Sequence, residues 1–168
     1  MPRVVAFLLL LCYGCLPAFA VLQPTKIFSD HMVLQRDTEV PVWGKADAGT
    51  TVTVAFAGQS VKAKADKQGR WKLKLDAMKA STEGRSLDIS SGGQRMLIKD
   101  VLVGDVWFAG GQSNMDYKVK GMARRLPEGK TLADRANYPA IRHRKVAEPH
   151  ASAPQTDLTG GSWVVCTP

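Results

Sequence analysis

Val-Leu-Val-Gly-Asp-Val-Trp-Phe-Ala-Gly-Gly-Gln-Ser-Asn-Met, residues 101–115, is the stretch of sequence that decides the fold. Its first nine residues form an apolar run that only Gly104 and Asp105 interrupt. A continuous apolar run bounded by glycines is typical of a strand buried on both faces, as in a parallel sheet. The sequence therefore predicts a buried strand from Val101 to Ala109.

A tight turn follows this predicted strand. Gly110 and Gly111 allow backbone conformations that are closed to other residues, and Asn114 is a good N-cap for a helix. Ser113 lies between the glycines and the helix start, so its hydroxyl would be held at the carboxyl end of a sheet. The arrangement is typical of a nucleophile elbow, although the spacing is not G-x-S-x-G. An ordinary connection between a strand and a helix has the same pattern.

Gly111-Gln112-Ser113-Asn114-Met115, preceded by the run from Val103 to Trp107, resembles the nucleophile block of the sialate O-acetylesterase family within the SGNH hydrolases. The resemblance implies a carbohydrate O-acetylesterase in which Ser113 attacks an acetyl ester of a sugar and forms an acyl-enzyme. It implies oxyanion or turn support from Gln112, Asn114 and Gly111, and no cofactor. No cluster with metal-ligand spacing is present in the sequence.

Residues 1–20 have the layout of a secretory signal peptide. Arg3 gives a positive start, Val4–Leu11 an apolar core, and Ala18-Phe19-Ala20 a cleavage site. The apolar part is too short to span a bilayer comfortably. We expect cleavage after Ala20 and export to the periplasm or the extracellular space. One cysteine, Cys166, would then remain, so no internal disulfide is expected.

Residues 21–100 have the pattern of an antiparallel β-sandwich domain. Thr51–Phe56 alternates strictly, and Gln59–Ala65 alternates after the turn at Ala57-Gly58. Asp66–Gly69 is predicted to be a hairpin turn, and Ser91-Gly92-Gly93 to be another. His31 is most simply explained as a turn residue that packs beside its strand.

The same β region also resembles the amino-terminal domain of the sialate O-acetylesterase family. Three motifs stand in the family's order: Phe28–Arg36, Pro41–Gly44 and Gly69–Trp71. The resemblance also reaches the end of the chain, where Trp163-Val-Val-Cys-Thr-Pro168 matches a run that leads into a helix of the catalytic domain. It implies that residues 101–168 are an incomplete α/β catalytic domain of the SGNH type.

Residues 116–168 are less regular. A helix is predicted from Asn114 to Met122 and one or two helical turns within Leu132–Tyr138, with a loop from Ala147 to Pro154. Between Asp116 and Lys145 there are nine lysines and arginines against three acids, and the whole chain has a formal charge of +8. A solvated surface is the simplest explanation, and a basic stripe that attracts a carboxylate-bearing sugar is the alternative. No aromatic residues interleave the stripe as a nucleic-acid platform would require.

A serine esterase needs a histidine base and an acid that orients it. In the family both lie far downstream, so we expect this chain to lack them and to be inactive alone. A local triad of Ser113, His143 or His150 and Asp157 is physically allowed, but neither histidine lies in a recognisable motif. The alternative function is a non-catalytic β-sandwich module that binds carbohydrate or another partner. The sequence does not indicate an oligomeric state.

Overall fold

The computed structural model describes residues 21–111, 113–116, 118, 121, 125–126, 128–146 and 152–167. The predicted signal peptide, Gln112 and His150 lie outside these residues, and so do the side chains of Asn114 and Asp116. Ten strands and two short helical segments make up the described part, so the prediction of a mainly β chain is confirmed. In this part, no helix has the length and apolar character needed to cross a bilayer.

Eight strands form the part of the chain from residue 21 to 104, which we call the β unit. In chain order they are β1 (Leu22–Pro24), β2 (Val33–Gln35), β3 (Val40–Ala46), β4 (Thr51–Phe56), β5 (Gln59–Lys64), β6 (Arg70–Leu75), β7 (Ser81–Ser91) and β8 (Gln94–Gly104). One sheet has the order β1-β3-β6, and the other has the order β2-β8-β7-β4-β5. All pairs are antiparallel except β2 and β8, which are parallel.

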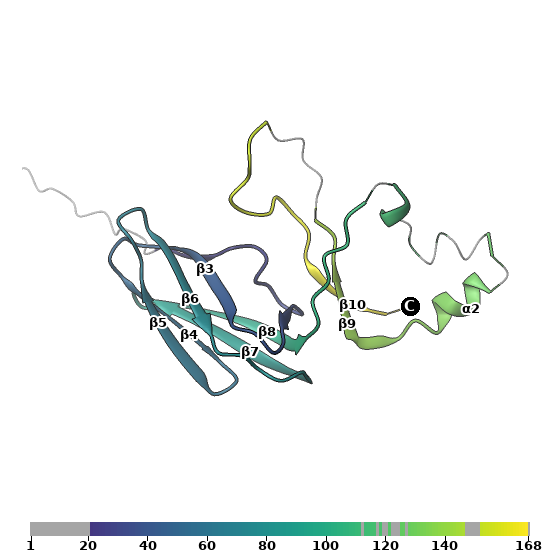
Figure 1. Ribbon diagram of the computed structural model, residues 1–168, viewed down its shortest axis with the longest axis horizontal. Helices are drawn as coiled ribbons and strands as arrows, with labels where there is room; N and C mark the ends of the chain where they lie inside the picture. Colours follow the sequence, from purple (N-terminus) through teal and green to yellow (C-terminus); the bar gives the residue numbers. More distant parts are fainter. Residues whose placement is uncertain are drawn as a thin grey trace, which may run out of the picture.

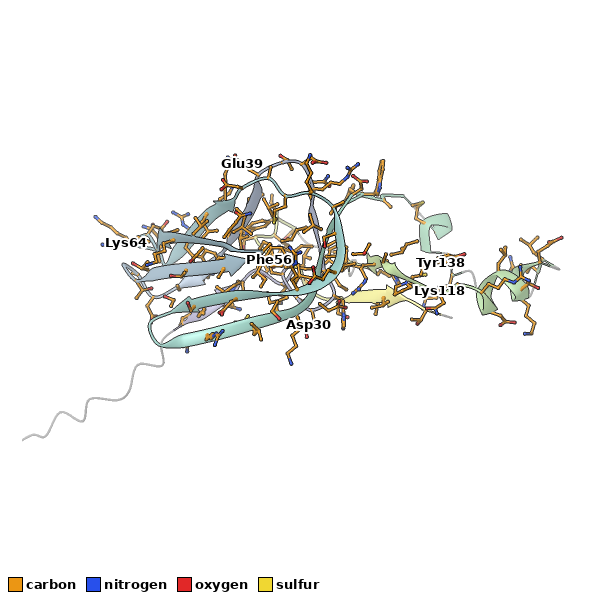
Figure 2. All side chains as sticks on the ribbon, turned by 90° about the horizontal axis from the view of Figure 1, so that it is seen from below. Asp30, Glu39, Phe56, Lys64, Lys118 and Tyr138 are labelled. Atoms are coloured by element: carbon orange, nitrogen blue, oxygen red, sulfur yellow. The ribbon has the colours of Figure 1, made fainter. Side chains whose placement is uncertain are left out.

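The two sheets of the β unit share one hydrophobic core. Every second residue of β3 and β6 is buried, as the alternating sequence of these strands requires. Val42 and Leu75 from the smaller sheet and Val54, Leu87 and Ile89 from the larger one are fully buried in the same cluster. Figure 2 shows Phe56 inside this unit, whereas Glu39 and Lys64 lie on its outside. The predicted alternating strands at Thr51–Phe56 and Gln59–Ala65 are confirmed as β4 and β5, and β5 ends one residue earlier, at Lys64.

The predicted hairpin at Asp66–Gly69 is wrong in one respect. The turn exists, and the Asp66 carboxylate accepts hydrogen bonds from the backbone N–H groups of Gln68 and Arg70. The strands on its two sides do not pair, because β5 belongs to the larger sheet and β6 to the smaller one. The turn therefore carries the chain from one sheet to the other. A local turn signal does not specify which strand becomes the partner.

The predicted strand from Val101 to Ala109 is correct only in its first part. Val101, Leu102 and Val103 are consecutive and all buried, as a strand covered on both faces requires. They lie at the end of β8, between β2 and β7, and the strand ends at Gly104. Residues 105–111 have no regular structure, and Trp107 and Phe108 are 87% and 97% exposed. No described strand lies beside them to continue the ladder.

Two further strands follow the β unit. A 3₁₀ turn, η1, covers Ser113–Asp116, and the short helix α2 covers Gly129–Asp134. The strands β9 (Tyr138–Arg144) and β10 (Trp163–Cys166) pair antiparallel as the β9–β10 hairpin. In Figure 1 this hairpin lies between the β unit and α2. Within the predicted helical stretch Leu132–Tyr138, the helix ends at Asp134 and Tyr138 already begins β9. The Trp163–Cys166 run, expected to lead into a helix, is itself a strand.

Candidate active site and its support

Ser113 lies on the surface, in the segment that connects β8 to β9. It is the first residue of η1, and its side chain is exposed. A Cβ atom at Gly111, two residues earlier, would meet the exposed side chain of Met115, which would have to move to make room for it. Gly111 therefore lets the Met115 side chain lie close to the backbone that precedes η1. The two other predicted site residues are not placed, since Gln112 and the Asn114 side chain lie outside the described part.

The start of the Ser113 segment is fastened to the β unit by two residues of the β2 region. Arg36 Nε donates to Asp105 Oδ1 at 2.8 Å, and the backbone N–H of Arg36 donates to the carbonyl of Gly104 at 2.9 Å. The backbone N–H of Val106 donates to Gln35 Oε1 at 2.8 Å. These bonds set the direction in which the chain leaves β8. They end at Val106, and the exposed residues 107–111 continue from there.

The end of the segment is fastened through Asp100. Asp100 Oδ2 accepts from Arg142 Nη1 at 2.6 Å, and Asp100 Oδ1 accepts from Arg142 Nη2 at 3.3 Å. His31 Nδ1 lies 2.7 Å from the same Oδ2. The Arg142 guanidinium, and secondarily His31, holds the pKa of the Asp100 carboxyl below its ordinary value. Because the Arg142 side chain is only 6% exposed, this ion pair is shielded from water on one side.

A β-bulge explains why Asp100 points at these two partners. Arg85 pairs with Val101 and Leu87 with Ile98, so Lys99 and Asp100 together oppose the single residue between them on β7. Asp100 has a φ of 54°, which aspartate tolerates better than most residues. A bulge re-aims a side chain out of the regular alternation. No pattern in the residues around Asp100 predicts this bulge.

The chain resembles proteins that act on acetylated carbohydrates. No protein-family model matches it. It is 31% identical over 141 residues to the sialate O-acetylesterase of Rattus norvegicus, covering 78% of this chain and 26% of the relative. It is 32% identical over 143 residues to the human sialate O-acetylesterase, covering 77% and 26%. The crystal structure of a carbohydrate acetylesterase from Xanthomonas citri superposes with a TM-score of 0.78 at 37% identity, covering 86% of this chain and 33% of that one.

The chain belongs to the sialate O-acetylesterase family. It spans about a quarter of the length of the curated relatives that it matches. The resemblance read from the Gly111–Met115 block and the three motifs of the β unit is therefore confirmed at the level of the family.

For a sialate O-acetylesterase relative, the placement of the histidines matters most. His31 is held by Asp100, and His143 is exposed on β9. Within the part of the chain that the structure describes, no hydrogen bond joins Ser113 to a histidine or a carboxylate. The Asp157 Oδ1 of the possible local triad accepts from the backbone N–H groups of Lys26 and Leu158. Among the described residues, Ser113 therefore does not form a Ser–His–acid triad.

The basic stripe is only partly a solvated surface in this family member. Lys130 pairs with Asp134 on the exposed side of α2. Arg142 and Arg144, by contrast, point back to the β unit, where Arg144 Nη1 donates to Ser29 Oγ at 3.2 Å. Two cations of the stripe therefore join the β9–β10 hairpin to the β unit. Alternation on β9 could have indicated this, because Arg142 and Arg144 share a face while His143 lies on the other.

No group of three or more histidine, cysteine or acidic side chains that could hold a metal occurs among the described residues. Cys166 is a free, half-exposed thiol. Neither observation assigns a role to a metal or to a thiol in this sialate O-acetylesterase relative.

Proposed function

We propose that this chain carries the nucleophile of a carbohydrate O-acetylesterase and that the nucleophile is Ser113. The supporting observation is the position of this hydroxyl. It is exposed at the first residue of the η1 turn, two residues after Gly111, whose backbone lies close to the Met115 side chain. The relatives are sialate O-acetylesterases and a carbohydrate acetylesterase, which favours an O-acetylated sugar as the substrate.

The proposed reaction has two halves. Ser113 Oγ attacks the carbonyl carbon of the acetyl ester while a general base removes its proton, and the sugar hydroxyl leaves after it receives that proton. Water then attacks the acetyl-enzyme, releases acetate and restores the Ser113 hydroxyl. The backbone N–H of Ser113 is a suitable donor to the oxyanion, with Gly111, Gln112 and Asn114 as supports of the turn or of the oxyanion.

We propose that the base and its acidic partner come from outside residues 1–168. Support comes from the described histidines, because neither His31 nor His143 is hydrogen-bonded to Ser113. The chain alone is then expected to be inactive, since a nucleophilic serine without its base loses most of its rate enhancement. The relatives contain about three-quarters of their length beyond the matched region, which is ample for these residues.

The finer fold proposal is the predicted β-sandwich of residues 21–100, which β8 extends to Gly104, followed by the first part of an SGNH-type α/β domain in the residues after Gly104. The shared core of the two sheets supports the sandwich. The exposure of Val106, Trp107 and Phe108 supports an incomplete second domain, because an apolar run of this kind is suited to a buried strand. Export through the signal peptide at residues 1–20 is part of the same proposal, on the sequence pattern alone.

A hybrid enzyme tests the proposal. Residues 21–167 would replace the matching third of the Xanthomonas citri carbohydrate acetylesterase, and acetate release would be measured with acetylated sugars. We expect turnover in the hybrid, a loss of about 10³-fold or more in kcat for Ser113→Ala, and no change for Ser60→Ala, an exposed serine of β5. A folded hybrid that remains active with Ser113→Ala would exclude Ser113 as the nucleophile. A chain that binds acetylated sugars but gives a folded, inactive hybrid would favour the alternative of a non-catalytic carbohydrate-binding module.

A further inference from the structure

An open groove follows the boundary between the β unit and the β9–β10 hairpin, and we call it the seam groove. Two adjoining hollows form it, and both are lined by Phe28, Ser29, Met96 and Ser162. The residues common to both hollows give an apolar lining at Phe28 and Met96 and hydroxyl groups at the two serines. Asp30 and His31 line only the hollow that lacks Arg144. None of the lining residues belongs to the segment that carries Ser113. The seam groove is therefore distinct from the candidate nucleophile.

One end of the seam groove is basic. Lys26 and Arg144 line it there together with Gln23, Pro24 and Gly161. The Lys26 side chain is exposed, whereas Arg144 is half-buried. Two cations at one end of a groove favour an anionic ligand there.

The Arg144 guanidinium has unused hydrogen-bond donors. It has five N–H groups, of which one donates to Ser29 Oγ at 3.2 Å and one to the Gly160 carbonyl at 3.3 Å. Both acceptors are uncharged, and both bonds are long. Arg144 Nε is buried without any acceptor among the residues that the structure describes. A half-buried guanidinium in this state is incompletely satisfied.

The charge of Arg144 is also incompletely compensated. Arg142, two residues earlier on the same face of β9, has the Asp100 carboxylate within 2.6 Å. No carboxylate in the described part of the chain lies within ion-pair distance of Arg144. Burial lowers the pKa of the Arg144 guanidinium, and Asp157 raises it from a longer distance. Because Asp157 Oδ1 already accepts two backbone N–H groups, it stabilises the loop as well as the charge.

We propose that the basic end of the seam groove binds the carboxylate of an acidic sugar. The carboxylate lies against the Arg144 guanidinium and the Lys26 ammonium group. The sugar ring lies along the apolar lining at Phe28 and Met96, and its hydroxyl groups reach Ser29 and Ser162. Carboxylate and guanidinium geometries are complementary, and a mostly apolar groove with a few polar groups is typical of small-molecule sites. A free inorganic anion would gain nothing from the apolar lining.

Binding measurements on the 168-residue chain test this proposal. The probes are the methyl glycosides of N-acetylneuraminic acid, glucuronic acid and galactose, with inorganic phosphate as the simple anion. Titration would be followed by calorimetry and by the indole N–H resonance of Trp163, which donates to the Ile27 carbonyl beside the groove. We expect both acidic glycosides to bind, more weakly as the salt concentration rises, and at least tenfold more tightly than the galactoside and phosphate.

Matched variants locate the site. Arg144→Gln is expected to weaken binding of the acidic glycosides at least tenfold, and Lys26→Gln to weaken it severalfold. Arg70→Gln makes the same charge change at an exposed Asp66 pair outside the groove and is expected to leave binding unchanged. Since the Lys26 side chain is exposed, its variant remains informative if Arg144→Gln unfolds the hairpin. Ser113→Ala is expected to bind normally, so the result does not depend on the proposed nucleophile. Equal binding of phosphate or galactoside, or unchanged binding in both groove variants, would overturn the proposal.

Discussion

Asp100 and Arg142, which are 42 residues apart in the chain, form a two-point ion pair that joins the bulge of β8 to β9. The pair closes the segment that carries Ser113, because that segment leaves the β unit at Gly104 and returns at β9. His31 lies on the same carboxylate. Asp100 thus contributes the ion pair by which the β9–β10 hairpin is attached to the β unit, in addition to the Arg144–Ser29 and Trp163–Ile27 hydrogen bonds.

Asp100→Asn is expected to destabilise the chain by about 2 kcal/mol, because it leaves the Arg142 guanidinium poorly compensated. Asparagine tolerates the positive φ of this position, so backbone strain does not contribute. Glu39→Gln, which removes an exposed pair with Lys74, is expected to change the free energy of unfolding by less than about 1 kcal/mol. Urea unfolding measures both. Equal effects of the two substitutions would contradict the importance of the Asp100 pair.

The Asp100 ion pair should also make the free energy of unfolding depend on pH. The pKa of Asp100 is lower in the folded state than in the unfolded state, so its contribution is fully present above the ordinary carboxyl pKa of about 3.9. It is lost as the pH falls through the lower, folded-state pKa. The stability difference between wild type and Asp100→Asn should therefore shrink as the pH falls below about 4. A difference that is as large at pH 2 as at pH 7 would contradict this assignment.

Substitution by alanine should destabilise the protein to different extents at two glycines that have similar φ angles. Gly69 and Gly58 have φ values of 73° and 82°, but a Cβ atom at Gly69 would lie 2.5 Å from the Ala46 carbonyl oxygen, whereas Gly58 has open space. Gly58→Ala should cost about 1 kcal/mol from the backbone alone, and Gly69→Ala should cost about 3 kcal/mol because the contact is added. Thermal unfolding of the two variants checks the order, and a larger loss at Gly58 would be inconsistent with the structure.

The shared core predicts cooperative unfolding of the two sheets. Leu75 lies in the smaller sheet and Leu87 in the larger one, and both are fully buried. Each substitution by alanine should cost about 3 kcal/mol and move a single transition. Leu97→Ala, at a residue that is 45% exposed, should cost less than about 1 kcal/mol. Separate transitions for the two leucine variants would mean that the sheets are independent.

The apolar residues after β8 should be open to solvent in the 168-residue chain. Trp107 is 87% exposed and Trp71 is 3% exposed. Acrylamide should therefore quench the fluorescence of Trp107. This quenchable fraction should be lost in Trp107→Phe and should remain in Trp71→Phe. In the hybrid enzyme this fraction should be protected, because the proposed α/β domain would cover the segment. Quenching of Trp107 that is equal in both forms would contradict the proposed completion of the domain.

Sequence patterns predicted those parts of the fold that local periodicity determines. Thr51–Phe56 alternates because one face is buried, and it forms β4 as expected. The turn at Asp66–Gly69 was located correctly, but its flanking strands pair elsewhere, since pairing depends on distant residues. The apolar run at Val106–Phe108 predicted a buried strand, but these residues are exposed. Burial would require a neighbouring strand, and the described residues do not supply one.

The candidate site was predictable only at its nucleophile position. Ser113 follows from a short contiguous motif, whereas the Asp100–Arg142 pair depends on a bulge and on a hairpin whose two strands are separated by a long connection. Tyr138–Ile141 of β9 is exposed, so this strand has little of the apolar alternation by which strands are recognised. The unsatisfied donors of Arg144 became visible only once its partners were known.

Trapping the acetyl-enzyme tests the central claim most directly. The hybrid enzyme would be mixed with an activated acetyl ester, quenched in acid within milliseconds, and digested for mass spectrometry. One acetyl group is expected on Ser113, with none on Ser60 and none anywhere in the Ser113→Ala hybrid. Turnover with the acetyl group on a different residue, or turnover undiminished in Ser113→Ala, would contradict the account.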